Sequence, residues 1–285
     1  MSEAPDVRGA PEAPFFPGGT AVSGLKVYDW PADDGLSGGS PHVHLACTEA
    51  YVVVGGEGTL QTLTVQGPAQ IPLRPGTVAW FGPGTIHRAV NGDGALRVVV
   101  LMQNGGLPEA GDAVLTFPPE VLADPAAYNA AASLLDPHAS HASDEQSARR
   151  RRDLAVQGFH RLVERTAAGD SSALEEFYRQ ALALRVDRLA DWEALWRGGP
   201  SMAVQRTGEH LAALQKGGID HLLRAAAQVR QSPPPPARRY GMCGRLDTYD
   251  VALSDGTLSE GALSDGTLSE GALPDATLSD GAAEG

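Results

Sequence analysis

Three side chains that commonly bind metal ions lie close together in the stretch PHVHLACTEA, near the start of the chain. His42 and His44 are two residues apart, so in a β-strand both imidazoles point to the same face. Glu49 is an odd number of residues further on, and it reaches that face only if residues 45–48 bend the chain. His87 follows a Gly-Pro-Gly turn and begins a strand of its own. Three imidazoles and one carboxylate form a ligand set for a first-row divalent ion.

The residues around these candidates have the pattern of short β-strands. From about residue 21 to residue 104, apolar runs such as YVVV, TLQTLTV, TVAWF and ALRVVVLM alternate with turns rich in Gly and Pro. Short strands with frequent turn signals are typical of an all-β sandwich or barrel, and no βαβ spacing is present. We therefore expect the four candidate ligands to converge within an all-β fold, either a sandwich or a barrel.

The spacing of these residues resembles the first conserved motif of the cupins, the family of small double-stranded β-helix barrels. That motif is a Gly, five residues, His-x-His, three or four residues, Glu, six residues and a Gly. His42, His44, Glu49 and Gly56 fall on it with the longer spacing, whereas Leu36 stands at the leading glycine position.

The second cupin motif is also present. It consists of a Gly, five residues, Pro-x-Gly, two residues, a His, three residues and an Asn. Gly76, Gly84, His87 and Asn91 match it, and Gly82 occupies the proline position. With both motifs in register, all four metal ligands of the family have a counterpart in this chain.

The resemblance covers about residues 21–104 and implies a double-stranded β-helix (cupin or jelly-roll) barrel. It further implies one divalent transition metal ion (Fe, Mn, Ni or Zn) on His42, His44, Glu49 and His87. Four ligands leave two positions of an octahedron open for a hydroxy acid, diol, enediol or dioxygen. Cupins include dioxygenases, sugar isomerases and epimerases, decarboxylases and non-catalytic binders, so the resemblance does not select a reaction.

Two hypotheses about function follow. The first is a metalloenzyme acting on a small polar metabolite, with the ion as Lewis acid or oxygen-activating centre. Isomerisation would need a base, and Tyr51, two residues from Glu49 on the same face, is the candidate catalytic residue. The alternative is a non-catalytic or regulatory cupin that senses a small ligand, with a basic helical segment that contacts protein or nucleic acid.

Composition limits the class of protein. The chain of 285 residues is 42% hydrophobic and 20% charged, and it has no apolar run of membrane-spanning length and no signal-peptide core, so we expect a cytoplasmic protein. Cys47 and Cys243 lie far apart, which argues against a disulfide framework. The net charge of −13 divides into −9 for residues 1–142, +5 for 143–245 and −9 for 246–285. These alternating signs indicate distinct physical units.

A helical extension is predicted for residues 143–230, after a flexible N-terminus (1–20) and an irregular connector (105–142). Capping-box signatures at Ser143 and Ser172 begin helices that run to about Ala168 and to a Gly-Gly-Pro stop, and shorter helices are expected over 202–216 and 219–230. An apolar stripe must pack on another helix, the outer barrel wall or a second subunit of a homodimer; it comprises Phe159, Leu174, Tyr178, Leu189 and Trp192. This extension should contribute no metal ligand.

The run Arg149–Arg152 does not predict nucleic-acid binding. Four consecutive helical residues point all the way round the helix, and acidic residues flank them. A solvated helix start, or a brace against an acidic barrel, explains the run better.

The C-terminal part begins with a Pro-rich spacer within residues 231–252, where RRYGMCGRLDTYDV is expected to pack back on the body as a strand. Residues 253–285 repeat a Leu-centred acidic pentad six times and contain no basic residue. Six pentads are too few to bury their own leucines, so we expect a disordered acidic tail.

Overall fold

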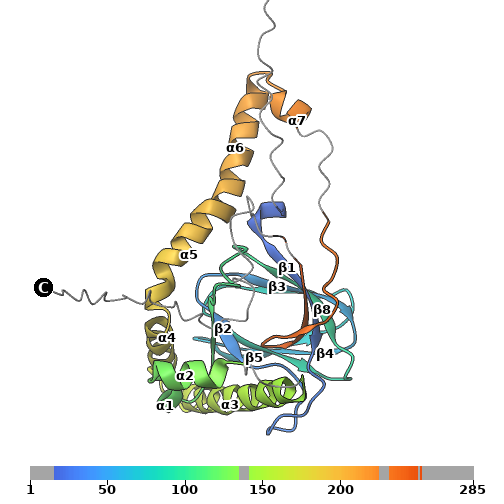
Figure 1. Ribbon diagram of the computed structural model, residues 1–285. Coiled ribbons are helices and arrows are strands. Elements are labelled where there is room, and N and C mark those ends of the chain that lie inside the picture. Colours follow the sequence, from blue (N-terminus) through green and yellow to red (C-terminus); the bar gives the residue numbers. More distant parts are fainter. Residues whose placement is uncertain (1–15, 135–140, 225–230, 250, 252–285) are drawn as a thin grey trace, which may run out of the picture.

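The computed structural model describes residues 16–134, 141–224, 231–249 and 251 (Figure 1). The acidic pentads and most of the predicted flexible N-terminus lie outside these residues. Within the described N-terminal part, Pro17–Gly19 forms a short 3-10 turn.

Two antiparallel sheets form the barrel. The first has the order β10-β11-β1-β8-β3-β6 and the second the order β5-β4-β7-β2-β9. The strands are β1 (Ala21–Val27), β2 (His42–His44), β3 (Glu49–Gly55), β4 (Gly58–Thr64), β5 (Gly67–Leu73), β6 (Val78–Phe81), β7 (Ile86–Asn91), β8 (Arg97–Met102), β9 (Ala113–Leu115), β10 (Arg239–Tyr240) and β11 (Gly244–Thr248). Strands distant in sequence alternate within each sheet, so the predicted double-stranded β-helix barrel is confirmed.

Alternating burial along the strands explains the barrel core. In β3 the side chains of Tyr51 and Val53 are buried, and in the neighbouring β8 those of Val98 and Val100 are buried. Period-two alternation places these residues on one face of the first sheet, where they pack in a single apolar cluster with Leu60 of the second sheet.

Glycine is required at Gly56, the last residue of the first motif. Its φ is +69°, and a Cβ there would lie 2.3 Å from the backbone carbon of Ala95. Both the left-handed conformation and the close approach of the backbone at Ala95 exclude a side chain, so this position tightens the hairpin between β3 and β4.

Helices cover the outer face of the second sheet (Figure 1). They pack through a second apolar cluster that joins Val43 and Ile86 of the sheet to Phe159 and Phe177. The helices are α1 (Pro119–Leu122), α2 (Pro125–Ala132), α3 (His141–Ala167), α4 (Ala173–Ala183), α5 (Leu189–Trp196), α6 (Met202–Gln215) and α7 (Asp220–Arg224), with a 3-10 turn at Val186–Arg188 and a π-helical turn at Arg197–Ser201. Of the three packing partners considered for the helical extension, α3 and α4 use the outer barrel wall, whereas α6 has no buried residue and extends away from the barrel (Figure 1). No helix in the described ranges is long and apolar enough to cross a membrane.

The prediction of one continuous second helix is wrong, because the segment is divided into α4 and α5. Arg185 leaves the helical conformation (φ −126°, ψ −2°). Its guanidinium donates to the carbonyls of Gly111 and Ala113, so tertiary contacts with the barrel rim accompany the break. After the break Leu189 is 41% exposed, contrary to the predicted stripe. Trp192, however, is only 4% exposed and packs in the same apolar cluster as Tyr51 and Val100.

Two arginines of the run, Arg149 and Arg152, brace α3 against the barrel. Arg152 is buried and donates to the carbonyls of Trp30 and Pro31. Arg149 lies over the Trp30 ring, 4.2 Å from its centroid, and pairs with Glu145. The interpretation of the run as a brace therefore describes these two members.

Segments outside residues 21–104 complete both sheets. The predicted C-terminal strand is present as β11, which pairs antiparallel with β1 so that Leu246 lies opposite Leu25. From the predicted irregular connector, β9 pairs with β2, and His42 lies opposite Leu115. The sheets thus draw on residues well beyond the range covered by the two motifs.

Candidate metal centre

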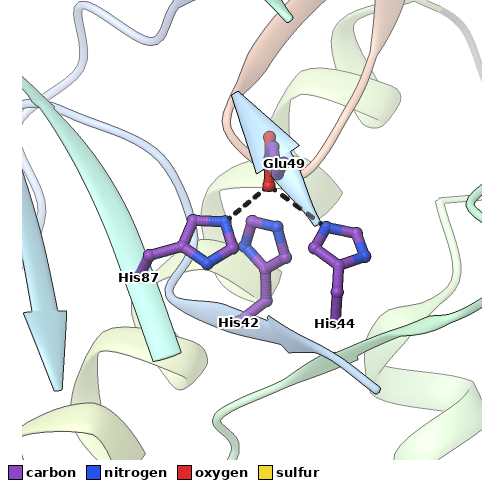
Figure 2. A group of neighbouring side chains, drawn as sticks. All are labelled: His42, His44, Glu49 and His87. Atoms are coloured by element: carbon purple, nitrogen blue, oxygen red, sulfur yellow. Dashed lines mark ion pairs between the residues drawn. The ribbon is translucent and has the colours of Figure 1, made fainter. Parts of the chain in front are cut away.

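The four predicted ligands meet inside the barrel. One ligand atom from each of His42, His44, Glu49 and His87 lies within 4.8 Å of the others, and all four residues are buried. Figure 2 shows the three imidazoles side by side with the Glu49 carboxylate facing them. The pairing of β2 with β7 places His42 directly opposite His87, while β3 delivers Glu49 from the other sheet.

The bend that brings Glu49 to this face depends on Asp112. One carboxylate oxygen of Asp112 accepts the backbone N–H groups of Leu45 and Ala46 at 3.0 and 2.8 Å, and the other accepts that of Cys47 at 3.2 Å. Asp112 is fully buried beside β9. Sequence reasoning missed it, because nothing near Asp112 in the chain indicates that it caps a bend more than sixty residues upstream.

Each histidine is oriented by an oxygen atom at its Nδ1. The His42 Nδ1 lies 2.9 Å from the Ser40 carbonyl, and that of His87 lies 3.0 Å from the Thr85 carbonyl. The Nδ1 of His44 lies 3.2 Å from an Asp112 carboxylate oxygen. Because these oxygens can only accept, each Nδ1 carries the proton when its ring is neutral, and each Nε2 then has the lone pair that could bind a metal.

Two buried atoms at the centre of the cluster have no hydrogen-bond partner. The Nε2 of His87 and the Oε2 of Glu49 lie 2.9 Å apart, yet neither makes a hydrogen bond of acceptable geometry. Buried polar atoms are rarely left in this state. A divalent transition metal ion would satisfy both, so the donor set and its orientation fit such an ion.

Charge within the cluster is strongly perturbed without a metal. Burial, reinforced by His87 and His44, holds the pKa of His42 well below its usual value. Burial would also lower the pKa of His44, but Asp112 and Glu49 outweigh it and raise that pKa to about 9. Burial would raise the pKa of Glu49, and the histidines reverse this and hold it well below the usual range. The metal-free centre thus holds a Glu49 carboxylate beside a protonated His44 at neutral pH.

Tyr51, the predicted catalytic residue, lies beside the cluster on the same strand as Glu49. Its ring is fully buried, and its hydroxyl lies 3.8 Å from the Sγ of Cys243. Burial raises the pKa of Tyr51 well above its usual value. The phenol is therefore protonated at neutral pH and can donate a proton or a hydrogen bond, but it is a poor base.

Cys243 is a second neighbour that sequence reasoning missed. It lies just before β11, and its Sγ lies 3.9 Å from the Nδ1 of His42. Burial raises the pKa of this thiol to about 12. Cys47 is buried in the same apolar cluster as Cys243.

The helical extension supports the centre without contributing a ligand within the described residues. The Tyr178 hydroxyl on α4 donates to the carbonyl of Gly84 at 2.6 Å, in the turn that precedes His87. A cavity of about 240 Å³ opens beside the cluster, lined by His42, His44 and Glu49 together with residues of β1, β8, β11 and the helices. A small molecule in this cavity would contact the ligand residues directly.

Comparisons with known proteins give only distant structural similarities. No family model and no curated protein matches the sequence. Among solved structures, the TDP-fucose-3,4-ketoisomerase of Campylobacter jejuni is 14% identical over 30% of this chain and 58% of that chain, with a TM-score of 0.24. An uncharacterized conserved protein with a double-stranded β-helix domain from Klebsiella pneumoniae is 19% identical over 30% of this chain and 64% of that one, with a TM-score of 0.23.

The chain thus spans less than two thirds of the length of both proteins. The capsular polysaccharide assembling protein CapF of Staphylococcus aureus is 19% identical over 30% of this chain and 22% of that one, with a TM-score of 0.23. The cupin-type fold of the present chain is established by its own strand order and pairing.

Proposed function

We propose that this protein is a metal-dependent cupin enzyme that acts on a small polar metabolite, such as a hydroxy acid or a sugar, in a reaction of the oxygenase or isomerase/epimerase type. The observation that carries the proposal is the convergence of four buried ligand atoms within 4.8 Å, beside a cavity of about 240 Å³ that three of the four residues, His42, His44 and Glu49, line. Buried sites that combine a metal ligand set with room for a small molecule are common catalytic sites.

His42, His44, Glu49 and His87 would hold the ion, which would be Fe, Mn, Ni or Zn. When bound, the ion would supply Lewis-acid or oxygen-activating chemistry. The surrounding residues have separate tasks. Asp112 holds the imidazole of His44 and the bend before Glu49, and apolar side chains of β1 and β8 in the cavity wall exclude water from the bound molecule.

The groups beside the centre that could take part in proton transfer are proton donors rather than bases. The Tyr51 hydroxyl and the Cys243 thiol both hold their protons at neutral pH, because burial raises the pKa of each. We propose Tyr51 as the group that donates a hydrogen bond or a proton; it does not line the cavity itself, and its hydroxyl lies 3.8 Å from the Sγ of Cys243, which does. Glu109 is the cavity-lining carboxylate outside the ligand set, and its Oε2 accepts the backbone N–H of Gly106 at 2.8 Å.

The same scarcity of bases favours the alternative, a non-catalytic cupin that binds a small ligand. In this alternative the helices would contact another protein or a second copy of the chain, since α6 presents exposed apolar residues, among them Val204, Leu211 and Leu214. Nucleic acid is less well supported as a partner. Helical arginines form local ion pairs that offset their charge, as in Arg165–Asp170, Arg179–Glu175 and Arg197–Glu193.

Elemental analysis of the purified full-length protein tests the metal site, and a ligand screen on the loaded protein then tests catalysis. We expect about one transition metal ion per chain in the wild type and a large loss of metal in Glu49→Gln. Glu57→Gln, which changes an exposed glutamate of the adjacent hairpin, should keep its metal. Equal metal content in the two variants, or none in the wild type, would contradict the proposal.

A further inference from the structure

The cavity beside the metal centre contains more positive than negative side chains. Arg151 of α3, Arg185 after α4 and Arg239 of β10 line it, whereas its carboxylates are Glu49 and Glu109. Glu49 already faces the histidines. A cavity with this lining attracts an anion before any metal is considered, and a divalent ion would increase the excess of positive charge.

Arg151 is the most unusual of the three arginines. Its side chain is only 4% exposed, and it donates to two neutral acceptors, the carbonyls of Ala132 and Gly241, at 3.3 and 2.7 Å. Its Nε is buried and has no hydrogen-bond partner. Across the part of the chain that the structure describes, Arg151 forms no ion pair with a carboxylate.

Other buried arginines of the same chain do have carboxylate partners. Arg88 is fully buried and pairs with Asp34, and Arg152, the next residue of the run, pairs with Asp153. Burying a guanidinium without a counter-charge is costly, and proteins normally supply one. The missing partner of Arg151 is therefore best supplied by a ligand in the cavity that this side chain lines.

Arg151 is also close to the metal centre. Its Nη2 contacts the carbonyl of Gly241, two residues before Cys243, and the Cys243 Sγ lies 3.9 Å from His42. Arg185 also lies near the centre, because it donates to the carbonyls of Gly111 and Ala113, the neighbours of Asp112. One small molecule can thus contact both the ligand cluster and the guanidinium groups.

We propose that Arg151, assisted by Arg185, binds the anionic group of the molecule that occupies this cavity, so that the protein selects small metabolites bearing a carboxylate or a phosphate. This proposal rests on the proposed function, because the metal ligands of the protein would contact the other end of the same bound molecule. Binding of the anion by Arg151 can be measured separately from metal binding. A planar guanidinium with an unused N–H suits such oxyanions better than a lysine ammonium would.

Isothermal titration of the full chain, loaded with Zn²⁺ or Ni²⁺ and also metal-free, tests this selection with matched probes. Lactate is compared with 1,2-propanediol, and glycerol 3-phosphate with glycerol, which separates carboxylate from phosphate recognition. At least one anion should bind roughly 10- to 100-fold more tightly than its neutral partner, as expected for charge-assisted hydrogen bonds. Equal affinity within both pairs would overturn the proposal.

Arg151→Gln is the informative variant, because its amide can still donate to the Gly241 carbonyl while the positive charge is lost. It should lose most of the anion preference and keep the affinity for the neutral probes and the metal stoichiometry. Arg150→Gln, which changes the exposed neighbour in the same helix, is the matched control and should behave as wild type. Arg151→Lys, which keeps the charge without the fork, should retain part of the preference and replaces the glutamine variant if that one does not fold.

The outcomes separate this inference from the proposed function. Metal bound at full stoichiometry without anion preference would overturn the anion inference alone. Anion preference that depends on Arg151 in a protein unable to bind metal would support the inference and overturn the proposed metalloenzyme. A loss of preference in Arg150→Gln equal to that in Arg151→Gln would show that general charge, and not Arg151, is responsible.

Discussion

Asp112→Asn is the substitution that tests most directly how this centre is built. The carboxylate accepts four donors: the N–H groups of Leu45, Ala46 and Cys47, at 3.0, 2.8 and 3.2 Å, and the Nδ1 of His44 at 3.2 Å. The first two bonds use Oδ1, which an asparagine retains. The last two use Oδ2, where an asparagine places an NH₂ group that cannot accept.

The expected consequence is a change of tautomer at His44. With an NH₂ group opposite Nδ1, the neutral ring is stabilised by accepting a hydrogen bond there, which moves the proton to Nε2, the atom that should bind the metal. Loss of a group that orients a metal-binding histidine typically weakens metal binding by about 10- to 100-fold. The cost in folding stability should be about 1–3 kcal/mol, the penalty for a buried donor such as the Cys47 N–H that loses its acceptor.

The assay is competition with a chelator of known affinity, alongside a thermal melt of the metal-free protein. Asp93→Asn is a suitable control, since Asp93 is an exposed carboxylate that also caps backbone N–H groups, those of Glu57 and Ala95. This control should leave metal affinity unchanged. Wild-type metal affinity in a folded Asp112→Asn variant would refute the assignment of the His44 tautomer to Asp112.

Three further predictions concern pH, packing and the tail. Because the pKa of His44 is raised from 6.5 to about 9, its protonation stabilises the metal-free fold fully below pH 6.5, and that stability should be lost as pH rises through about 9. Metal must displace this proton, so the apparent Kd for the metal should fall about tenfold for each unit by which the pH rises toward 9. A pH-independent Kd would contradict the pairing of His44 with Glu49 and Asp112. Trp192→Ala should destabilise the protein by about 3–5 kcal/mol in urea unfolding, because the indole is buried and donates to the Ala110 carbonyl, yet metal stoichiometry should persist. Deletion of residues 253–285 should leave the melting temperature and metal content nearly unchanged, whereas a cut after Arg245 should lower both the melting temperature and expression, since it removes most of β11 from its pairing with β1.

Local spacing, together with the two motifs that resemble those of the cupins, was sufficient to predict the barrel and the convergence of the four candidate ligands. A strand repeats every two residues, so His42 and His44 had to share a face, and a turn glycine next to a strand start was enough to place His87. Gly56 could be identified from the first motif, and the structure supplies the reason for a glycine there, which is its left-handed backbone conformation. The helical stripe was predicted for the same reason, and Phe159 and Trp192 are buried as expected, while Leu189 is not, because the chain breaks at Arg185.

The residues that orient and surround the ligands could not be predicted in this way. Asp112, Cys243 and Arg151 belong to segments far from the motifs, and they reach the centre only through the pairing of β9 with β2, the pairing of β11 with β1 and the packing of α3 on the barrel. Pairing register and helix docking depend on long-range contacts that leave no local periodicity in the sequence. Two short motifs in the sequence therefore determine the candidate ligand set. The tertiary structure decides the tautomers, the pKa values and the charge of the cavity, because it places those distant side chains against the ligands.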